Sequence, residues 1–252
     1  AGIKRLIIGL QSSENEELRR LGRIHTYEDL LGTFRLARRM GFGNINVDLM
    51  SAIPGQRLAG WEETLRKTAE LRPEHISAYS LIIEEGTWFY EKYGEGRHAE
   101  ELPGEEEERQ MYRKTLEVLK EYGYHRYEIS NYALPGYACR HNLGYWNRTE
   151  YLGIGTGASS LVDNRRWNFG EAPVELSVQE QMEECMFLGL RKMEGVSKAR
   201  FQETFGRRME DVYGRVLKKM VGMGLMEEIG GFVRLTERGI DVSNGVMCEF
   251  LL

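Results

Sequence analysis

The stretch NINVDLM, residues 44–50, alternates two kinds of side chain and decides the fold class. Its apolar positions share one face of a strand: Ile45, Val47 and Leu49. Its polar positions share the other face: Asn44, Asn46 and Asp48. A strand of an open sheet with helices on both sides is apolar on both faces. A strand with one polar face fits a barrel wall better, with polar side chains lining a functional lumen.

The segments on either side of this strand alternate between strand and helix. KRLIIGLQ, residues 4–11, predicts a first strand, and HISAYSLI, residues 75–82, predicts a third. One crossover helix follows Thr26, whose spacing to Asp29 fits a capping box, and another is predicted over 58–71. Strands separated by helices imply a parallel sheet. Three strands cannot close a barrel, so we expect another part of the protein to cover their edges and an N-terminal part to be missing.

The rest of the chain reads as a connecting region and a small terminal domain. Six glutamates between residues 100 and 108 fit the positive end of a helix dipole better than a metal site. Residues 124–170 show short strands and glycine turns, and GIGTG within them lacks the spacing of a phosphate loop. The last segment has a winged-helix pattern of three helices and a hairpin: 178–193, 197–205, 209–223 and a turn at Gly230-Gly231.

Composition excludes several classes of protein. A net charge of −5 provides no basic field for nucleic acid or an anionic membrane. Residues 177–252 hold eleven Lys/Arg and twelve Asp/Glu, which favours an interaction or lid domain over a nucleic-acid reader. Three scattered cysteines, Cys139, Cys185 and Cys248, suit a reducing cytosol, so we expect a cytoplasmic protein. No apolar run is long enough to span a bilayer, which leaves only a peripheral membrane contact open.

Three polar residues lie at or just beyond the carboxyl ends of predicted strands: Gln11, Arg23 and Asp48. In barrels of this connectivity, that rim is where the chemistry takes place. An amide, a guanidinium and a carboxylate there could hold a ligand with ribose hydroxyls, an amine and a carboxylate. A structural Arg23–Asp48 ion pair explains the same spacing equally well.

CRHNLGYW, residues 139–146, combines a thiol, an imidazole and two large aromatics in eight positions. The simplest interpretation is a partly buried aromatic turn with His141 hydrogen-bonded to the backbone. Cys139 and His141 alone are too few ligands for structural zinc. A lone imidazole flanked by aromatics does suit a flat apolar ligand with an axial iron position.

Several stretches together resemble the radical-SAM haem chaperones HemW, close relatives of the oxygen-independent coproporphyrinogen III oxidases HemN. These stretches are GLQSSENEELRRLGRIHT, NINVDLMSAIPGQ, HISAYSLIIEEGT, YEISNYALPGYACRHNLGYW and YLGIGTGA. The resemblance implies an α/β fold: the C-terminal half of a partial TIM-type barrel over 1–95, a connecting region over 96–175, and a winged-helix-like α+β domain over 176–252. It also implies S-adenosyl-L-methionine (SAM), a [4Fe–4S] cluster and haem as cofactors.

The resemblance also assigns residues. The SAM contacts that it implies are Gln11, Arg23, Asp48 and Ile82, the last expected on the third strand. HNLGYW matches the haem-associated HNxxYW pattern, which the oxidases lack, so the chaperone is favoured. The implied haem contacts are Arg140, His141, Asn142, Tyr145 and Trp146. His141 is the expected iron ligand, and Arg140 could pair with a propionate.

Two features depart from the family pattern. The cluster motif CxxxCxxC is absent, so we expect its ligands in a preceding segment and no catalysis by this chain alone. Ser159 stands where the chaperones carry histidine, which leaves a second haem ligand unassigned. Two alternatives stay open, an oxidase that acts in porphyrin biosynthesis and a non-catalytic scaffold. The expected partners are haem and haem-accepting proteins, not nucleic acid.

Overall fold

The computed structural model describes residues 2–252, which form two compact units. Unit 1 runs to Arg126 and also contains Ser130–Ala138. Unit 2 contains Tyr127–Ile129 and Cys139–Leu252. The chain first passes from one unit to the other within strand β4 (His125–Glu128).

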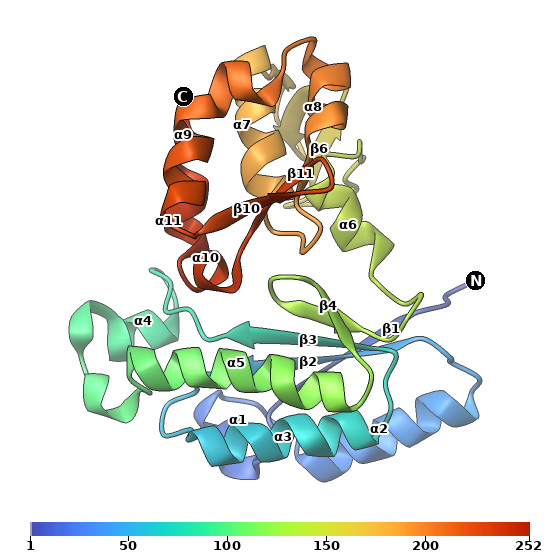
Figure 1. The fold of residues 1–252 in the computed structure, drawn as a ribbon. Coiled ribbons are helices and arrows are strands. Elements are labelled where there is room, and N and C mark those ends of the chain that lie inside the picture. Colours follow the sequence, from blue (N-terminus) through green and yellow to red (C-terminus); the bar gives the residue numbers. More distant parts are fainter. Residues whose placement is uncertain (1) are drawn as a thin grey trace. The chain divides into compact units, whose positions relative to one another are not determined.

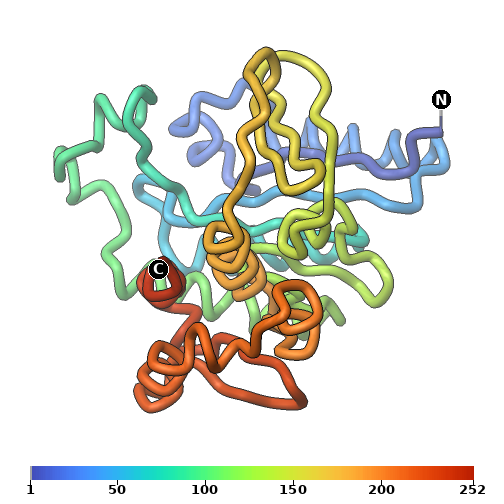
Figure 2. The backbone as a smooth tube through the Cα atoms, turned by 90° about the horizontal axis from the view of Figure 1, so that it is seen from above, coloured from blue at the N-terminus to red at the C-terminus, as the bar shows by residue number. Residues whose placement is uncertain are grey.

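A five-stranded sheet in the order β1-β2-β3-β5-β4 organises unit 1. Strands β1 (Leu6–Gln11), β2 (Ile45–Ser51) and β3 (His75–Ser80) are parallel and run side by side in blue and teal in Figure 2. The predicted parallel sheet is therefore confirmed. The expectation that another part of the protein covers the edges of these strands is confirmed at β3, because β5 (Asn131–Ala133) pairs antiparallel with it. The placement of Ile82 on the third strand is wrong, since β3 ends at Ser80.

The crossover helices lie close to their predicted positions. Helix α2 (Tyr27–Arg39) has the full capping box between Thr26 and Asp29, and α3 spans Leu58–Glu70. Helix α5 (Glu105–Glu121) carries four glutamates in its first turn, which confirms the helix-dipole interpretation. Short helices that the sequence pattern did not predict are α1 (Asn15–Arg20), α4 (Trp88–Tyr93), and the 3₁₀ turns Gly94–Gly96 and Ala99–Glu101.

Helices α2, α3 and α5 pack on one face of the sheet (Figure 1). Val47 and Leu49 are fully buried in this core together with Trp61 of α3. The Trp61 indole Nε1 donates to the Met111 carbonyl at 3.1 Å and to Thr115 Oγ1 at 2.9 Å, which ties α3 to α5. Burial of each such side chain contributes about 2 kcal/mol. The division of NINVDLM into an apolar and a polar face is confirmed, and the sheet is open, with β1 and β4 at its ends.

Unit 2 contains the predicted winged-helix pattern. Its helices are α7 (Val178–Gly189), α8 (Lys198–Phe205) and α9 (Met209–Gly222). The hairpin β10 (Met226–Ile229) and β11 (Phe232–Leu235) follows, and β9 (Val196–Ser197) pairs with β11. The hairpin turns at Gly230 and Gly231 with φ of +58° and +82°, values that a two-residue type I′ turn requires. Helices α10 (Glu237–Asp241) and α11 (Ser243–Cys248) end the chain.

Residues 124–170 contain a helix where the sequence indicated only short strands and turns. Helix α6 (Arg140–Trp146) covers most of CRHNLGYW. Two turns of helix are too short to show a periodic apolar face, which is why the pattern missed them. A three-stranded antiparallel sheet follows: β6 (Ser159–Val162), β7 (Arg165–Asn168) and β8 (Val174–Glu175). Across residues 2–252, no helix combines the length and the apolar character needed to cross a membrane.

Candidate functional site

The polar face of the unit 1 sheet centres on Asp48. Asp48 lies in β2 with Gly9 of β1 and Ser77 of β3 as its register partners. Register partners in a parallel pair project to the same face, so the half-buried Asp48 carboxylate has only small neighbours on either side. It accepts a hydrogen bond from Asn46 Nδ2 at 2.6 Å.

A hydrogen-bonded chain behind Asp48 fixes its orientation. The Oδ1 atom of Asn46 accepts from His75 Nδ1 at 2.5 Å and from Ser77 Oγ at 3.3 Å, while its Nδ2 donates to Asp48. Burial, together with the Arg5 charge, lowers the pKa of His75 to about 3, so the imidazole is neutral at pH 7. Sequence reasoning missed His75 and Ser77, because both read as ordinary residues of a strand.

Gln11 shares this face. It ends β1 with a φ of +73° and is 8% exposed. Its Nε2 atom would lie 3.0 Å from a Cβ added to Gly9, so the amide folds back over the glycine beside Asp48. The structure therefore brings together two of the four residues that the sequence assigned to SAM.

The other two lie apart from that face. Arg23 is exposed in the turn between α1 and α2, where its backbone N–H donates to the Leu18 carbonyl at 2.9 Å. Within residues 2–252, no ion pair joins Arg23 to Asp48, so the structural ion pair weighed as an alternative is wrong. Ile82 is 73% exposed, two residues beyond the end of β3.

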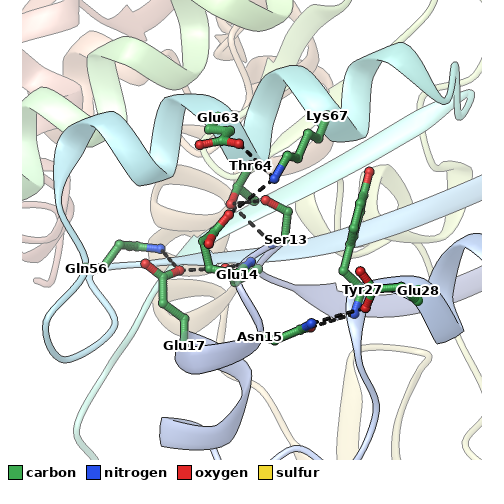
Figure 3. Close-up of polar contacts among 11 residues, drawn as sticks. Ser13, Glu14, Asn15, Glu17, Tyr27, Glu28, Gln56, Glu63, Thr64 and Lys67 are labelled. Carbon is green, nitrogen blue, oxygen red and sulfur yellow. Dashed lines mark hydrogen bonds and ion pairs between the residues drawn. The ribbon is translucent and has the colours of Figure 1, made fainter.

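A buried carboxylate fixes the loops at the carboxyl ends of β1 and β2 (Figure 3). Glu17 of α1 is 7% exposed and accepts from Ser12 Oγ at 2.5 Å and from Gln56 Nε2 at 2.8 Å. Ser12 follows β1 and Gln56 follows β2, so the two loops are joined through one side chain. In the described part of the chain, Glu17 has no cationic partner within an ion-pair distance.

Further contacts hold α1 and its preceding loop against α3 and the loop before it. Ser13 Oγ lies 3.0 Å from Thr64 Oγ1, and these side chains face each other in Figure 3. Arg20 Nη1 donates to the Pro54 carbonyl at 2.7 Å. Gly55 adopts a φ of +74°, a left-handed conformation that residues with a Cβ rarely adopt, so this turn favours glycine. These contacts join the loops that follow β1 and β2, next to Gln11 in the chain.

In unit 2, helix α6 divides the predicted haem residues between two sides. His141 is exposed, and its ring meets Tyr145 edge to face at a centroid distance of 4.6 Å. Tyr145 in turn meets Tyr151 at 4.7 Å. His141 makes no hydrogen bond or ion pair within residues 2–252, so the backbone-bonded histidine of the simplest sequence interpretation is wrong. Arg140 is also exposed at the start of this helix.

The other side of α6 is anchored inside the unit. Asn142 hydrogen-bonds to the side chain of Tyr127, whose pKa burial raises. The Trp146 ring stacks under the Arg191 guanidinium, with 4.4 Å from Arg191 Cζ to the ring centroid. Positions i and i+4 of a helix share a face, so His141 pairs with Tyr145 and Asn142 with Trp146. Of the predicted haem contacts, Trp146 is therefore not on the His141 side.

The implied cofactors can be compared with the side chains that the structure offers. A [4Fe–4S] cluster needs clustered thiolates. In the part of the chain that the structure describes, the three cysteines are free. Among these described residues, His98, Glu100 and Glu101 form a group of potential metal ligands, with ligand atoms within 4.8 Å of one another. These residues do not fit the cluster. The exposed imidazole of His141 does fit an axial haem ligand, and Ser159, whose Oγ donates to Asn168 Oδ1 at 2.6 Å, does not supply a second one.

Two family models match this chain: the radical SAM superfamily over residues 1–68 and the HemN C-terminal domain over residues 176–242. The haem chaperone HemW of Bacillus subtilis is 38% identical over the whole chain, which spans 70% of that protein. The haem chaperone HemW of Escherichia coli is 32% identical, again over the whole chain and 69% of the relative.

The fold is also that of a solved protein. Coproporphyrinogen III oxidase HemN from Escherichia coli, a radical SAM enzyme, matches 99% of this chain with a TM-score of 0.81 at 18% identity, and the chain spans 64% of it. This structural likeness confirms the radical-SAM α/β fold that the sequence motifs indicated, and the identity to the chaperones extends from the first strand to the winged-helix pattern. The chain belongs to the radical-SAM HemW/HemN family.

Proposed function

We propose that this chain is part of a haem chaperone, binds haem through His141 on α6, and takes part in passing haem to haem-requiring proteins. The observation that carries the proposal is the state of His141. Its imidazole is exposed and has no polar partner within residues 2–252, although a ring contact with Tyr145 orients it. An oriented imidazole with a free nitrogen lone pair is suited to an axial position on haem iron.

The residues around His141 have different roles in this proposal. Tyr145 and Tyr151 form an edge-to-face series that holds the His141 ring and adds apolar area for a flat ligand. Arg140 is exposed one residue before His141 and is available to pair with a propionate. Asn142 and Trp146 contact Tyr127 and Arg191 from another face of α6 and act as positioning residues. The HemW proteins that this chain resembles carry the name haem chaperone, which supports the same function.

A haem titration followed by Soret absorbance tests this assignment. His141→Ala is expected to weaken haem binding about tenfold or more and to shift the Soret maximum. His125→Ala removes another exposed histidine of the same chain and is expected to leave both unchanged. Equal affinity and an unshifted spectrum in His141→Ala would remove His141 from the proposal.

We also propose that the polar face around Gln11 and Asp48 contacts SAM. The Asp48 carboxylate has a neutral hydrogen-bond donor as its partner, so it can attract the positive sulfonium or amino group. Arg23 and Ile82, exposed beyond the strand ends, are available for the rest of the molecule. The match of residues 1–68 to the radical SAM superfamily supports this site.

The charge argument predicts a difference between SAM and S-adenosylhomocysteine, which lacks the sulfonium charge. Equilibrium dialysis should show that Asp48→Asn weakens SAM severalfold more than S-adenosylhomocysteine, whereas Asp163→Asn, an exposed control, changes neither. Equal losses for both nucleosides would contradict a sulfonium contact.

The shared fold with HemN, at a TM-score of 0.81, supports a second candidate, an oxidase acting on coproporphyrinogen III. Turnover of coproporphyrinogen III by a longer protein that joins this chain to a cluster-binding segment, after cluster reconstitution, would favour the oxidase. Haem binding that depends on His141, without turnover, would favour the chaperone.

A further inference from the structure

Unit 2 contains a cavity of about 490 Å³ that the haem proposal does not use. Its walls come from the end of α6, from α7 and the loop after it, from α8, and from β11. The residues that matter for its chemistry are Trp146, Arg148, Lys192, Arg200, Phe205 and Phe232. His141 and Tyr145 are not among its lining residues. Its volume lies within the range of small-molecule sites.

Two cations line this cavity without an ion-pair partner in the described residues. Lys192 Nζ donates to Asn147 Oδ1 at 2.6 Å, and burial lowers the pKa of Lys192. Arg200 stands in the first turn of α8 with an exposed side chain. Two acids also line the cavity, Glu150 and Glu194, and both are exposed. Lys192 is half-buried, so its charge is less hydrated than the charges of the exposed Arg200, Glu150 and Glu194.

Two buried donors at the same cavity also lack an acceptor. The Arg148 side chain is 10% exposed, and its Nε donates to Glu184 Oε2 at 2.7 Å. Its Nη2 atom has no hydrogen-bond partner, and neither does Nε1 of Trp146. A buried donor without an acceptor costs about 1–3 kcal/mol. A ligand oxygen that reached these atoms would recover that free energy.

Aromatic surface completes the lining. Phe205 and Phe232 are half-buried, and Trp146 presents a ring already held by Arg191. We propose that this cavity binds a small organic anion, a flat apolar body that carries a carboxylate or a phosphate. Lys192 and Arg200 hold the anionic group, and the three aromatic rings hold the body. The site is separate from the His141 side of α6, so it goes beyond the haem proposal.

Three small probes of one shape test the proposal by isothermal titration with the whole chain: 1-naphthoate, 1-naphthyl phosphate and the neutral 1-naphthalenemethanol. At least one anion is expected to bind about tenfold more tightly than the alcohol, because a charged hydrogen bond replaces solvent in a partly buried site. The preferred anion identifies the group as carboxylate or phosphate. Equal binding of the alcohol, or no binding of either anion, would overturn the proposal.

Variants locate the site. Lys192→Gln and Arg200→Gln should each weaken the preferred anion about tenfold. Lys218→Gln removes an exposed charge of α9 away from the cavity and should have no effect, and His141→Ala should also leave the affinity unchanged. Arg200 is exposed, so its variant tests the site even if Lys192→Gln loses stability. An equal loss in Lys218→Gln or in His141→Ala would place the anion elsewhere and overturn the assignment.

Discussion

Both units contain buried glutamates, and the surroundings of Glu17 in unit 1 differ from those of Glu184 in unit 2. Glu17 of unit 1 is 7% exposed and accepts from two neutral donors, Ser12 and Gln56. Glu184 of unit 2 is 6% exposed and is held by two guanidinium groups, Arg148 at 2.7 Å and Arg166. The Glu17 arrangement keeps an uncompensated negative charge near the strand ends. The Glu184 arrangement combines two arginines with one carboxylate, so it has a net charge of +1.

This difference predicts the charge of the ligands. The side of unit 1 that contains Asp48 suits a cation such as a sulfonium, because Asp48 and Glu17 both have neutral partners. Unit 2 offers Lys192 and Arg200 without ion-pair partners in the described residues, which suits anions. The two candidate sites therefore differ in the sign of the charged side chains that lack an ion-pair partner in the described residues.

The largest expected effect follows from removing only the charge of Glu184. Glu184→Gln leaves Arg148 as a buried cation without a counter-charge and should destabilise unit 2 by about 3 kcal/mol. Urea unfolding and hydrogen exchange of the α7 amides measure the loss. Glu203→Gln on α8, an exposed residue, is the matched control and should have almost no effect. A loss of only about 1 kcal/mol in the unfolding free energy of Glu184→Gln would mean that Glu17 and Glu184 depend on their partners to a similar extent.

A pH dependence is expected from the neutral network of unit 1. The pKa of His75 is lowered from 6.5 to about 3 in the folded protein, mainly by burial. The unfolded chain binds the proton below pH 6.5 and the folded chain does not, so this contribution is complete above that pH and is lost as the pH falls toward 3. Between pH 7 and pH 5 the loss from this group is about 2 kcal/mol.

His75→Asn isolates this group, because an amide can still donate to Asn46 but does not titrate in this range. The variant should lose stability less steeply than the parent between pH 7 and pH 5 in urea unfolding. Parallel curves for the two proteins would show that His75 is not the titrating group.

The smallest effect on the free energy of unfolding is expected from Glu17→Gln, the unit 1 counterpart of Glu184→Gln. Glu17→Gln keeps the shape of the side chain, and its partners are neutral, so the loss should be about 1 kcal/mol. Unfolding of Glu17→Gln beside the surface control Glu16→Gln measures it. A loss as large as that of Glu184→Gln would break the comparison, because it would require a cation near Glu17.

The sequence predicted the features that local patterns encode. The two faces of β2, the Thr26–Asp29 capping box and the Gly230-Gly231 turn all depend on residues close together in the chain. The pairing of β5 with β3 and the Glu17–Gln56 contact join residues far apart in sequence, which periodicity cannot reveal. The cavity is assembled from residues between 146 and 232, and only tertiary packing brings them together.

The candidate site residues were also predictable only where a local sequence pattern encodes their position. Gln11 and Asp48 were found because strand ends can be read from the sequence, and the structure places both on one face. The outward side of α6 was not predicted, because seven residues of helix show too little periodicity. The orientation of His141 away from Trp146 depends on that helix.

The most direct test of the central claim is pulsed electron paramagnetic resonance of ferric haem bound to chain that carries ¹⁵N-labelled histidine. We predict a strong hyperfine coupling from one histidine nitrogen to the iron, retained in His125→Ala and lost in His141→Ala. The same coupling in His141→Ala would contradict the account, because one of the other histidines would then hold the iron.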